Sequence, residues 1–505
     1  MRRYLTAAAI VAGLASPAGA QSGLTFVVTT AGDGADAAPG NGICAASGGA
    51  CTFRAAIQEA NATAGPDAIH FAIGSGLQTI TVASTLPAIS ETATIDGTTQ
   101  PGFAGNPIIV VNGGGQAGPG LLITGGGTTL RGLVIGNFKG HGIELNTGGG
   151  NVLEGNYVGM AAGGTSTLAN TGHGVVVANS PNNRIGGPSV AQRNLISKNT
   201  AKGNGGGILL EGAGGNVIQG NFIGTDITGM VEHPNEARGI AIIGSSNNLI
   251  GGPGPGAGNL IAGNRATGVR MLGGSSNNVV QGNLIGVNRA LTGVIPNDRG
   301  VQIRDGNNNQ VLGNVIMGNT YDGVLVWGGN NSLIQGNYIA YNGYGPIGDP
   351  VEAGYFGIWI ASGTGNQVVS NAIYGNYHLG INLSTDLSTA NDAGDGDSGA
   401  NALQNSPRIT SAIAAGANTA VVGALNSSPN SAFRLQFFAS SACDSVGSGE
   451  GQYLVGETTL ASDASGDATF AIAIGAALPA GWAVTATATD AAGNTSEFSP
   501  CAGVR

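Results

Sequence analysis

The chain has 505 residues, of which 93 are glycine and only 9% are charged, and its formal net charge is −10. Globular domains usually carry about 25% charged residues, and so acidic a chain lacks the basic stripe that nucleic-acid binding requires. Hydrophobic residues still make up 41% of the chain, with regularly recurring isoleucine and valine, which excludes a disordered Gly-rich polymer.

Residues 1–20 have the pattern of a secretory signal peptide. Arg2 and Arg3 form a basic start, residues 4–15 are mostly apolar, and an Ala-Gly-Ala cleavage site ends at Ala20. The apolar stretch is too short for a membrane-spanning helix, which needs about 20 apolar residues. We therefore predict cleavage after Ala20, no transmembrane anchor, and a secreted, extracellular or cell-surface protein.

Residues 21–70 are expected to form an N-terminal cap. A glycine-rich loop contains Cys44 and Cys51, and residues 51–61 form the most convincing amphipathic helix of the sequence. A repeat protein exposes an apolar core and a strand edge at each end, so we expect this helix to cover the first repeat. The residues predicted on its apolar face are Phe53, Ala56, Ile57 and Ala60.

A strand signature, Gly-[Ile/Val]-x-[Leu/Ile/Val/Met], recurs through residues 71–390. Successive copies lie 23 to 34 residues apart, so the basic unit is about 22 to 23 residues and most units carry an insertion of about ten. The signature glycines are Gly142, Gly174, Gly207, Gly239, Gly268, Gly300, Gly323, Gly357 and Gly380.

Each unit holds two further apolar segments that end in Asn or Gly-Asn, and no helical periodicity is present. Three short strands per unit, with glycine and asparagine at left-handed turns, predict a right-handed parallel β-helix of about ten coils. The 14-residue span from Asn156 to Asn170 recurs twice, which predicts one loop repeated on one side. Turn asparagines expected to stack as a hydrogen-bonded ladder are Asn156, Asn221, Asn283, Asn314 and Asn337.

Four residues just before signature glycines are candidates for catalysis. A polysaccharide lyase would need acidic residues stacked on neighbouring coils to hold calcium, with an arginine as base. Asp298 and Asp322 could supply the carboxylates, and Arg238 and Arg299 lie beside them. The alternative is a set of ordinary turn salt bridges, each of which contributes little to stability.

Outward strand positions suggest a ligand-binding ribbon. Counted from the signature glycines, Arg270, Arg304, Trp327 and Trp359 should point outward on nearby coils, with Tyr321 at the same edge. Coils stack at about 4.8 Å, so these side chains would be continuous. Aromatic rings beside arginines suit sugar rings and their carboxylates. Alternatively, an insertion or the C-terminal domain covers the tryptophans.

Residues 391–406 form an acidic joint. Asp392, Asp395 and Asp397 lie among glycines, and closely spaced carboxylate oxygens are ligands that Ca²⁺ prefers. The spacing is not that of an EF-hand, and the alternative is a solvated acidic linker. If Ca²⁺ binds, we expect it to fix the joint between domains.

Residues 407–505 contain alternating segments separated by turns, which predict an Ig-like antiparallel β-sandwich. Cys443 and Cys501 lie in this part. The four cysteines permit three pairings, and in an oxidising compartment we expect Cys44 with Cys51 and Cys443 with Cys501. Structural zinc is disfavoured because no CxxC pair or nearby histidine set accompanies them.

Several segments resemble a known family. The CTFRAAI segment from Cys51 is similar to the CSLREA motif of secreted, mainly bacterial β-helix proteins, and so are TIDGTTQPGFAGNP from Thr94 and GNFIGTDITG from Gly220. The chain departs from that motif with Thr52-Phe53 in place of Ser-Leu and Ala55 in place of Glu. The resemblance implies export and a pectate-lyase-like fold, a fold that also serves lyases, epimerases and glycosidases.

The resulting hypothesis is an exported, non-catalytic protein that binds a polysaccharide or cell-surface glycan through an outward strand face. The first alternative is a lyase or glycoside hydrolase on acidic polysaccharide, which would need three or more acidic residues converging with an arginine in one cleft. The second alternative is a structural envelope component, which predicts neither that cluster nor exposed tryptophans.

Overall fold

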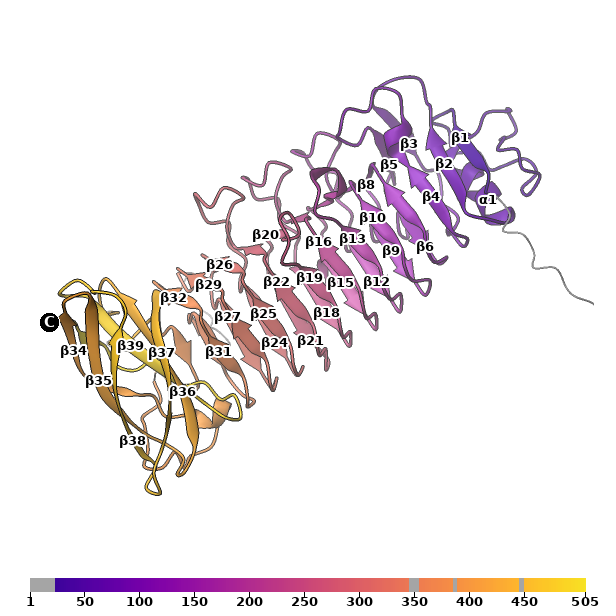
Figure 1. Ribbon diagram of the computed structural model, residues 1–505. Helices are drawn as coiled ribbons and strands as arrows, with labels where there is room; N and C mark the ends of the chain where they lie inside the picture. The colour runs from indigo at the N-terminus through magenta and orange to yellow at the C-terminus, as the bar shows by residue number, and fades with distance from the viewer. Residues whose placement is uncertain (1–22, 345–353, 385–387, 445–448) are drawn as a thin grey trace, which may run out of the picture.

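The computed structural model describes residues 23–344, 354–384, 388–444 and 449–505. A long stack of parallel strands lies between one α-helix and a C-terminal antiparallel sandwich (Figure 1). The predicted fold class, a right-handed parallel β-helix with a capping helix and a β-sandwich, is confirmed. The predicted signal peptide lies outside the described residues, and the domain boundaries stay a prediction. None of the helices in the described ranges is long and apolar enough to cross a membrane.

The first sheet of the β-helix has 12 parallel strands. Ile185, Ile218, Ile250 and Val280 lie in register on successive strands and are fully buried. Burying one such side chain stabilises the fold by about 1.5–3 kcal/mol, so stacking compensates for the shortness of each strand. The strands are β1 (Thr25–Val28), β2 (Asp67–Phe71), β4 (Ala93–Asp96), β7 (Thr129–Arg131), β10 (Val152–Glu154), β13 (Arg184–Gly186), β16 (Val217–Gln219), β19 (Leu249–Gly251), β22 (Val279–Gln281), β25 (Gln310–Leu312), β28 (Leu333–Gln335) and β31 (Gln367–Val369).

The second sheet has 11 parallel strands and carries the repeated insertions. Its strands are β3 (Gln78–Thr81), β5 (Ile109–Asn112), β8 (Leu133–Gly136), β11 (Tyr157–Val158), β14 (Leu195–Ile196), β17 (Phe222–Ile223), β20 (Leu260–Ile261), β23 (Leu284–Ile285), β26 (Val315–Met317), β29 (Tyr338–Ala340) and β32 (Ala372–Tyr374).

The third sheet has ten parallel strands and is built from the glycine signature. A Cβ on Gly323 would lie 2.6 Å from the carbonyl oxygen of Gly357 on the next coil, so close approach of the coils requires glycine there. The strands are β6 (Leu121–Ile123), β9 (Ile143–Asn146), β12 (Val175–Ala178), β15 (Gly206–Glu211), β18 (Arg238–Ile243), β21 (Val269–Leu272), β24 (Val301–Arg304), β27 (Val324–Trp327), β30 (Ile358–Ile360) and β33 (Ile381–Asn382).

The predicted asparagine ladder exists and is longer than expected. Between the first and second sheets, each side-chain amide donates to the amide oxygen of the next coil at 2.9–3.1 Å. All the members are buried, so the ladder satisfies amides that would otherwise lack partners. The ladder runs through Asn156, Asn194, Asn221, Asn259, Asn283, Asn314, Asn337 and Asn371.

A second ladder lies between the second and third sheets, at the other end of each second-sheet strand. Its amides also donate to the next coil, at 2.9–3.1 Å. Its members are Asn170, Asn199, Asn235, Asn264, Asn297, Asn319, Asn342 and Asn376.

The insertions form the same short hairpin three times, where their common length predicted a repeated loop. Isolated antiparallel bridges close them at Met160 and Thr167, at Thr225 and Glu232, and at Val287 and Val294. The hairpins project from one side of the β-helix (Figure 1). Their apolar residues pack with the outer face of the second sheet, in a cluster of buried residues that includes Met160, Tyr157, Phe222, Leu260 and Ile295.

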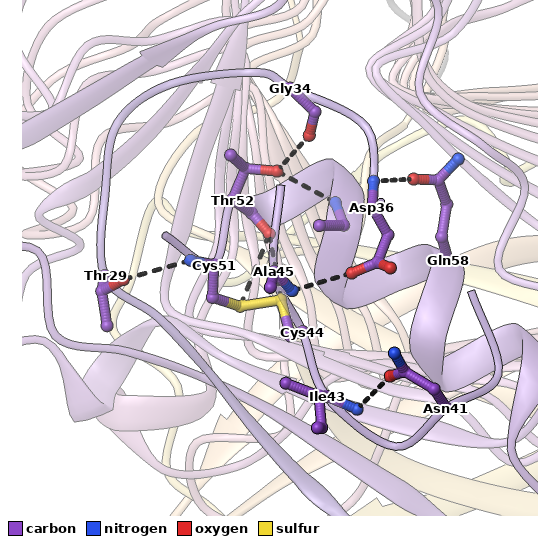
Figure 2. The surroundings of a disulfide bond; sticks show 11 residues. Thr29, Gly34, Asp36, Asn41, Ile43, Cys44, Ala45, Cys51, Thr52 and Gln58 are labelled. Carbon is purple, nitrogen blue, oxygen red and sulfur yellow. Dashed lines mark hydrogen bonds between the residues drawn. A yellow bond between two sulfur atoms is a disulfide. The ribbon is translucent and has the colours of Figure 1, made fainter. Parts of the chain in front are cut away.

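Helix α1 (Phe53–Ala62) caps the N-terminal coil. Thr52 begins it, because its hydroxyl accepts the N–H of Ala55 at 3.0 Å. The four predicted apolar residues are all buried. Arg54 is also buried and pairs with Asp33 at 2.8 Å, which ties the helix to the preceding loop. The expected disulfide between Cys44 and Cys51 closes that loop (Figure 2).

The sandwich has one sheet of three strands and one of four, all antiparallel. The expected disulfide between Cys443 and Cys501 is present. The first sheet contains β34 (Arg408–Ala415), β35 (Asn418–Asn426) and β38 (Asp467–Ile474), and the second contains β36 (Ala432–Ser440), β37 (Tyr453–Ala461), β39 (Ala483–Asp490) and β40 (Ala502–Gly503).

Side chains of the sandwich region cover the last coil. They accept backbone N–H groups in or next to the last strands of the first and third sheets, and so complete the hydrogen bonding of an edge that would otherwise be open. The pairs are Asn494 with Gly365 at 2.7 Å, Thr495 with Val368 at 3.0 Å, Gln436 with Ser370 at 2.9 Å and Glu497 with Leu383 at 3.0 Å.

Glu450 covers the end of the second ladder. Its carboxylate accepts the N–H groups of Gly375 and Asn376 and the side-chain amide of Asn376. Burial raises the pKa of Glu450 to about 7, although the hydrogen bonds from Asn376 and Gly375 oppose this shift and the charge of Asp444 adds to it. The protonated carboxyl is therefore favoured by folding.

We expect the stability of the protein to depend on Glu450 between pH 4.5 and 7. The raised pKa means that its contribution is fully present below the ordinary value of 4.5 and is lost as the pH rises through about 7. The loss should be about 1–3 kcal/mol in the free energy of unfolding. Thermal unfolding measured from pH 4.5 to 8 should show a falling midpoint for the wild type and a flatter profile for Glu450→Gln.

Glu457→Gln is the matched control, because the carboxylate of Glu457 is 54% exposed and its pKa is lowered by Arg434. Its profile should keep the wild-type slope. Equal slopes for the wild type and Glu450→Gln would show that another group carries the pH dependence.

Candidate functional site

The structure places the catalytic candidates at the turn before the third sheet. Asp322 has no exposed side-chain surface, and Arg299 donates to it from Nε at 3.1 Å. Its other oxygen accepts the N–H of Phe356 at 3.1 Å. Burial raises the pKa of Asp322, and the charge of Arg299 opposes the shift. Asp322 thus holds the turn and does not face solvent.

Asp298 and Arg238 lie close enough to affect each other. Burial raises the pKa of Asp298, and the charges of Arg299, Arg238 and Arg265 oppose the shift. Burial lowers the pKa of Arg238 to about 10, and the charge of Arg270 adds to this effect. The structure therefore brings the four candidates into one neighbourhood that is richer in arginine than in carboxylate.

The expected open tryptophan ribbon is wrong at Trp359. The register does place Trp359 beside Leu325, and Trp327 beside Arg304, as the count from the glycines predicted. Trp359 is only 8% exposed, because Leu325 and other apolar residues pack around it. Its indole N–H donates to Ser384 at 2.9 Å. Trp327 is half-buried, with the Arg304 guanidinium 5.2 Å from its ring.

Tyrosines form a more open aromatic surface that the sequence interpretation missed. Seven of the ten tyrosines lie between residues 321 and 377, and this clustering was a readable signal. We call them the tyrosine ridge. Their rings touch in two runs, with centroids 5.3–5.9 Å apart: Tyr338, Tyr374 and Tyr341 in one, and Tyr344, Tyr377, Tyr355 and Tyr321 in the other.

Four ridge tyrosines are exposed. The exposed fractions are 36% for Tyr338, 46% for Tyr341, 63% for Tyr344 and 38% for Tyr377. Three of them lie next to ladder asparagines, whose buried amides fix the turn while the neighbouring side chain points outward. Tyr338 follows Asn337 of the first ladder, whereas Tyr341 and Tyr377 lie beside the second ladder on neighbouring coils, so the ladders fix the turns from which the rings project.

Tyr341 has a backbone conformation that normally belongs to glycine. Its φ is +53°, and the residue before the ladder asparagine is also left-handed in four other coils, where it is Gly263, Gly318, Gly375 or Lys198, with φ of +73°, +67°, +63° and +62°. A side chain in this left-handed region costs about 1–2 kcal/mol. Tyr341 therefore holds its ring at a turn where three coils use glycine, at a cost that the surrounding ladder must offset.

A groove adjoins the ridge. It has a volume of about 490 Å³ and lies between the third insertion and the tyrosines. Val294 and Pro296 form one wall, and Tyr341 and Tyr344 form the other. Its size is within the range of ligand pockets, about 300–1,000 Å³.

The acidic joint forms the candidate metal site. Asp392, Asp395 and Asp397 each offer an oxygen within 4.8 Å of the others. Among the described residues, Oδ1 of Asp392 and Oδ1 of Asp397 are buried without a hydrogen-bond partner. Burial raises the pKa of both Asp395 and Asp397, and the charge of Asp392 adds to each shift. The donor set fits a hard cation.

The joint is also tied to the sandwich. Asp395 accepts the N–H of Asn405 and the hydroxyl of Ser427, each at 2.8 Å. Asn405 in turn donates to the carbonyl oxygen of Asn426, in β35. A cation held here would therefore stiffen the connection between the β-helix and the sandwich.

Comparisons with known families support the fold. A family model for the right-handed β-helix region matches residues 222–410, and one for the periplasmic copper-binding protein NosD matches residues 124–293. Each match covers less than half of the chain. The acidic cluster at the joint lies outside the NosD match. No curated protein sequence matches the chain.

Several solved structures are similar at low identity. The A-module of mannuronan C-5 epimerase AlgE6 from Azotobacter vinelandii is 16% identical, covering 73% of this chain and 100% of its own, with a TM-score of 0.40. ORF18 of Geobacillus virus E2 is 13% identical, covering 95% and 76%, with a TM-score of 0.42. The Dettilon tailspike protein is 15% identical, covering 88% and 90%, with a TM-score of 0.37. The three parallel sheets, together with the match to the right-handed β-helix family model, define the class of the fold, a right-handed parallel β-helix.

Proposed function

We propose that the protein is an exported glycan-binding protein and that its tyrosine ridge binds polysaccharide without cleaving it. The observation that carries this proposal is the run of exposed tyrosines on the last coils, with Tyr341 held in a glycine-type conformation. Aromatic faces bury the apolar face of a sugar ring, while the hydroxyl at the tip reaches sugar hydroxyls or water.

Geometry supports an extended ligand. The exposed rings lie on successive coils of a rigid stack and border an open groove. A surface organised in this way needs little rearrangement on binding, which lowers the entropic cost of association.

The non-catalytic part of the proposal is supported by the state of the acidic candidates. Asp322 is buried against Arg299, and Asp298 lies among three arginines, so neither is an open carboxylate. Export is supported by the predicted leader and by two disulfides, which persist in oxidising compartments.

Substitution of exposed ridge tyrosines should weaken glycan binding. Tyr344→Ala and Tyr377→Ala should each reduce affinity about fivefold, from about 1 kcal/mol of lost aromatic contact. Tyr341→Gly should weaken binding similarly with little change in the thermal midpoint, because glycine relieves the strained backbone. Retardation in gels that contain neutral and acidic polysaccharides measures affinity, and new reducing ends and unsaturated uronates measure cleavage.

Trp327→Ala is the control, because it removes an aromatic side chain from the third sheet and leaves the ridge intact. If Trp327→Ala lost binding and the tyrosine variants retained it, the result would contradict binding at the tyrosine ridge. It would favour the outward strand positions around Trp327 instead. Cleavage of a polysaccharide by the wild type that disappears on Asp298→Asn would contradict the proposal that the protein is non-catalytic.

We also propose that Asp392, Asp395 and Asp397 bind Ca²⁺ at the joint. The two unpartnered buried oxygens support the proposal, because such atoms are destabilising without a proton or a cation. Calcium at about 100 times its dissociation constant should stabilise the folded protein by about 2.7 kcal/mol.

The measurement is the thermal midpoint with and without Ca²⁺, together with direct titration of the ion. Asp395→Asn should remove the increase in midpoint, whereas Asp305→Asn, which changes a carboxylate that is 64% exposed on the β-helix, should retain it. An unchanged wild-type midpoint at millimolar Ca²⁺ would contradict the site.

A further inference from the structure

Two arginines share one aromatic ring on the outer face of the second sheet. The Cζ atom of Arg193 lies 4.1 Å from the ring centroid of Phe222, and that of Arg289 lies 5.9 Å from it. Arg193 precedes β14, Phe222 begins β17, and Arg289 lies in the third insertion. The fold therefore brings together two cations that are 96 residues apart in sequence.

Neither arginine has an acidic partner in the described part of the chain. The six ion pairs formed there involve other arginines. Burial lowers the pKa of Arg193, and the charge of Arg289 lowers it further. Two like charges held together are unfavourable unless something compensates them, and no acidic residue in the described ranges forms an ion pair with either arginine.

The surroundings hold the pair in place. Nε of Arg193 donates to the carbonyl oxygen of Gly220 at 3.2 Å, and the backbone N–H of Arg289 donates to Gly229 in the second insertion at 2.9 Å. A cation–π contact with Phe222 explains why one arginine covers the ring. The Arg289 guanidinium lies near the outer limit of such a contact, and its side chain stays exposed beside the first.

We propose that Arg193 and Arg289 form a binding site for a carboxylate or sulfate group of an anionic polysaccharide. Arginine presents paired N–H donors that match both groups. That the anion belongs to a glycan rests on the proposed function. The same sheet carries Tyr338 of the ridge four strands further along, about 19 Å away at strand spacing, so one extended chain can reach both.

The test uses three polymers with the same backbone: neutral dextran, carboxymethyl dextran and dextran sulfate. Gel retardation of the full mature protein on each polymer gives the preference for charge. We expect Arg289→Gln to lower the affinity for the charged polymers about tenfold, and the double variant with Arg193→Gln to abolish the preference over neutral dextran. Arg408→Gln, an exposed arginine on β34, makes the same change in charge and should leave the preference unaltered.

Loss of preference on carboxymethyl dextran alone identifies a carboxylate site, and loss on dextran sulfate alone identifies a sulfate site. Equal retardation of the wild type and the double variant on both charged polymers overturns the site, as does absence of wild-type preference for either. Arg289→Gln keeps the test valid if Arg193→Gln impairs folding, which the thermal midpoint reports.

The same variants distinguish a failure of the anion site from a failure of the proposed function. The arginine variants could lose the charge preference while Tyr344→Ala and Tyr377→Ala bind like the wild type. That result would support the anion site and contradict binding at the tyrosine ridge. If only the tyrosine variants lose affinity, the result supports binding at the tyrosine ridge and contradicts the anion site.

Discussion

The structure depends on one constraint: each coil leaves backbone and turn amides that only the next coil can satisfy. Within the stack, neighbouring strands pair and buried asparagines pass hydrogen bonds from turn to turn. At the ends the chain must supply other groups. Helix α1 covers the first coil, and the sandwich covers the last with side-chain acceptors, of which the Glu450 carboxylate takes three donors of the second ladder's turn.

The same constraint decides where function can reside. Inward positions are filled by aliphatic side chains, and turn positions beside the ladders are fixed by buried amides, so only outward side chains are free to vary. On the middle coils the insertions pack over the outer face of the second sheet. On the last coils tyrosines occupy comparable outward positions and stay exposed. Tyr341 takes a left-handed turn position there, which is glycine in three other coils and Lys198 in a fourth.

Sequence periodicity predicted the strands, the first ladder and the repeated hairpin, because each follows from local spacing. It could not predict burial on the outer surface. Trp359 was expected to be open, but Phe356 and Leu379, from turns of its own and the next coil, pack against it. The clustering of seven tyrosines between residues 321 and 377 was visible in the sequence, but their exposure was not, because it depends on which outer positions the coils leave uncovered. The Arg193–Arg289 pair could not be predicted from sequence, since it depends on how the turn before β14 meets the third insertion.

The most direct test of the account is hydrogen exchange of the mature protein with and without a polysaccharide that retards it. Binding at the tyrosine ridge predicts slower exchange in residues 337–344 and 374–378, with β24 and β27 of the third sheet unchanged. Protection confined to β24 and β27, around Arg304 and Trp327, would contradict the ridge and place the ligand on the third sheet instead.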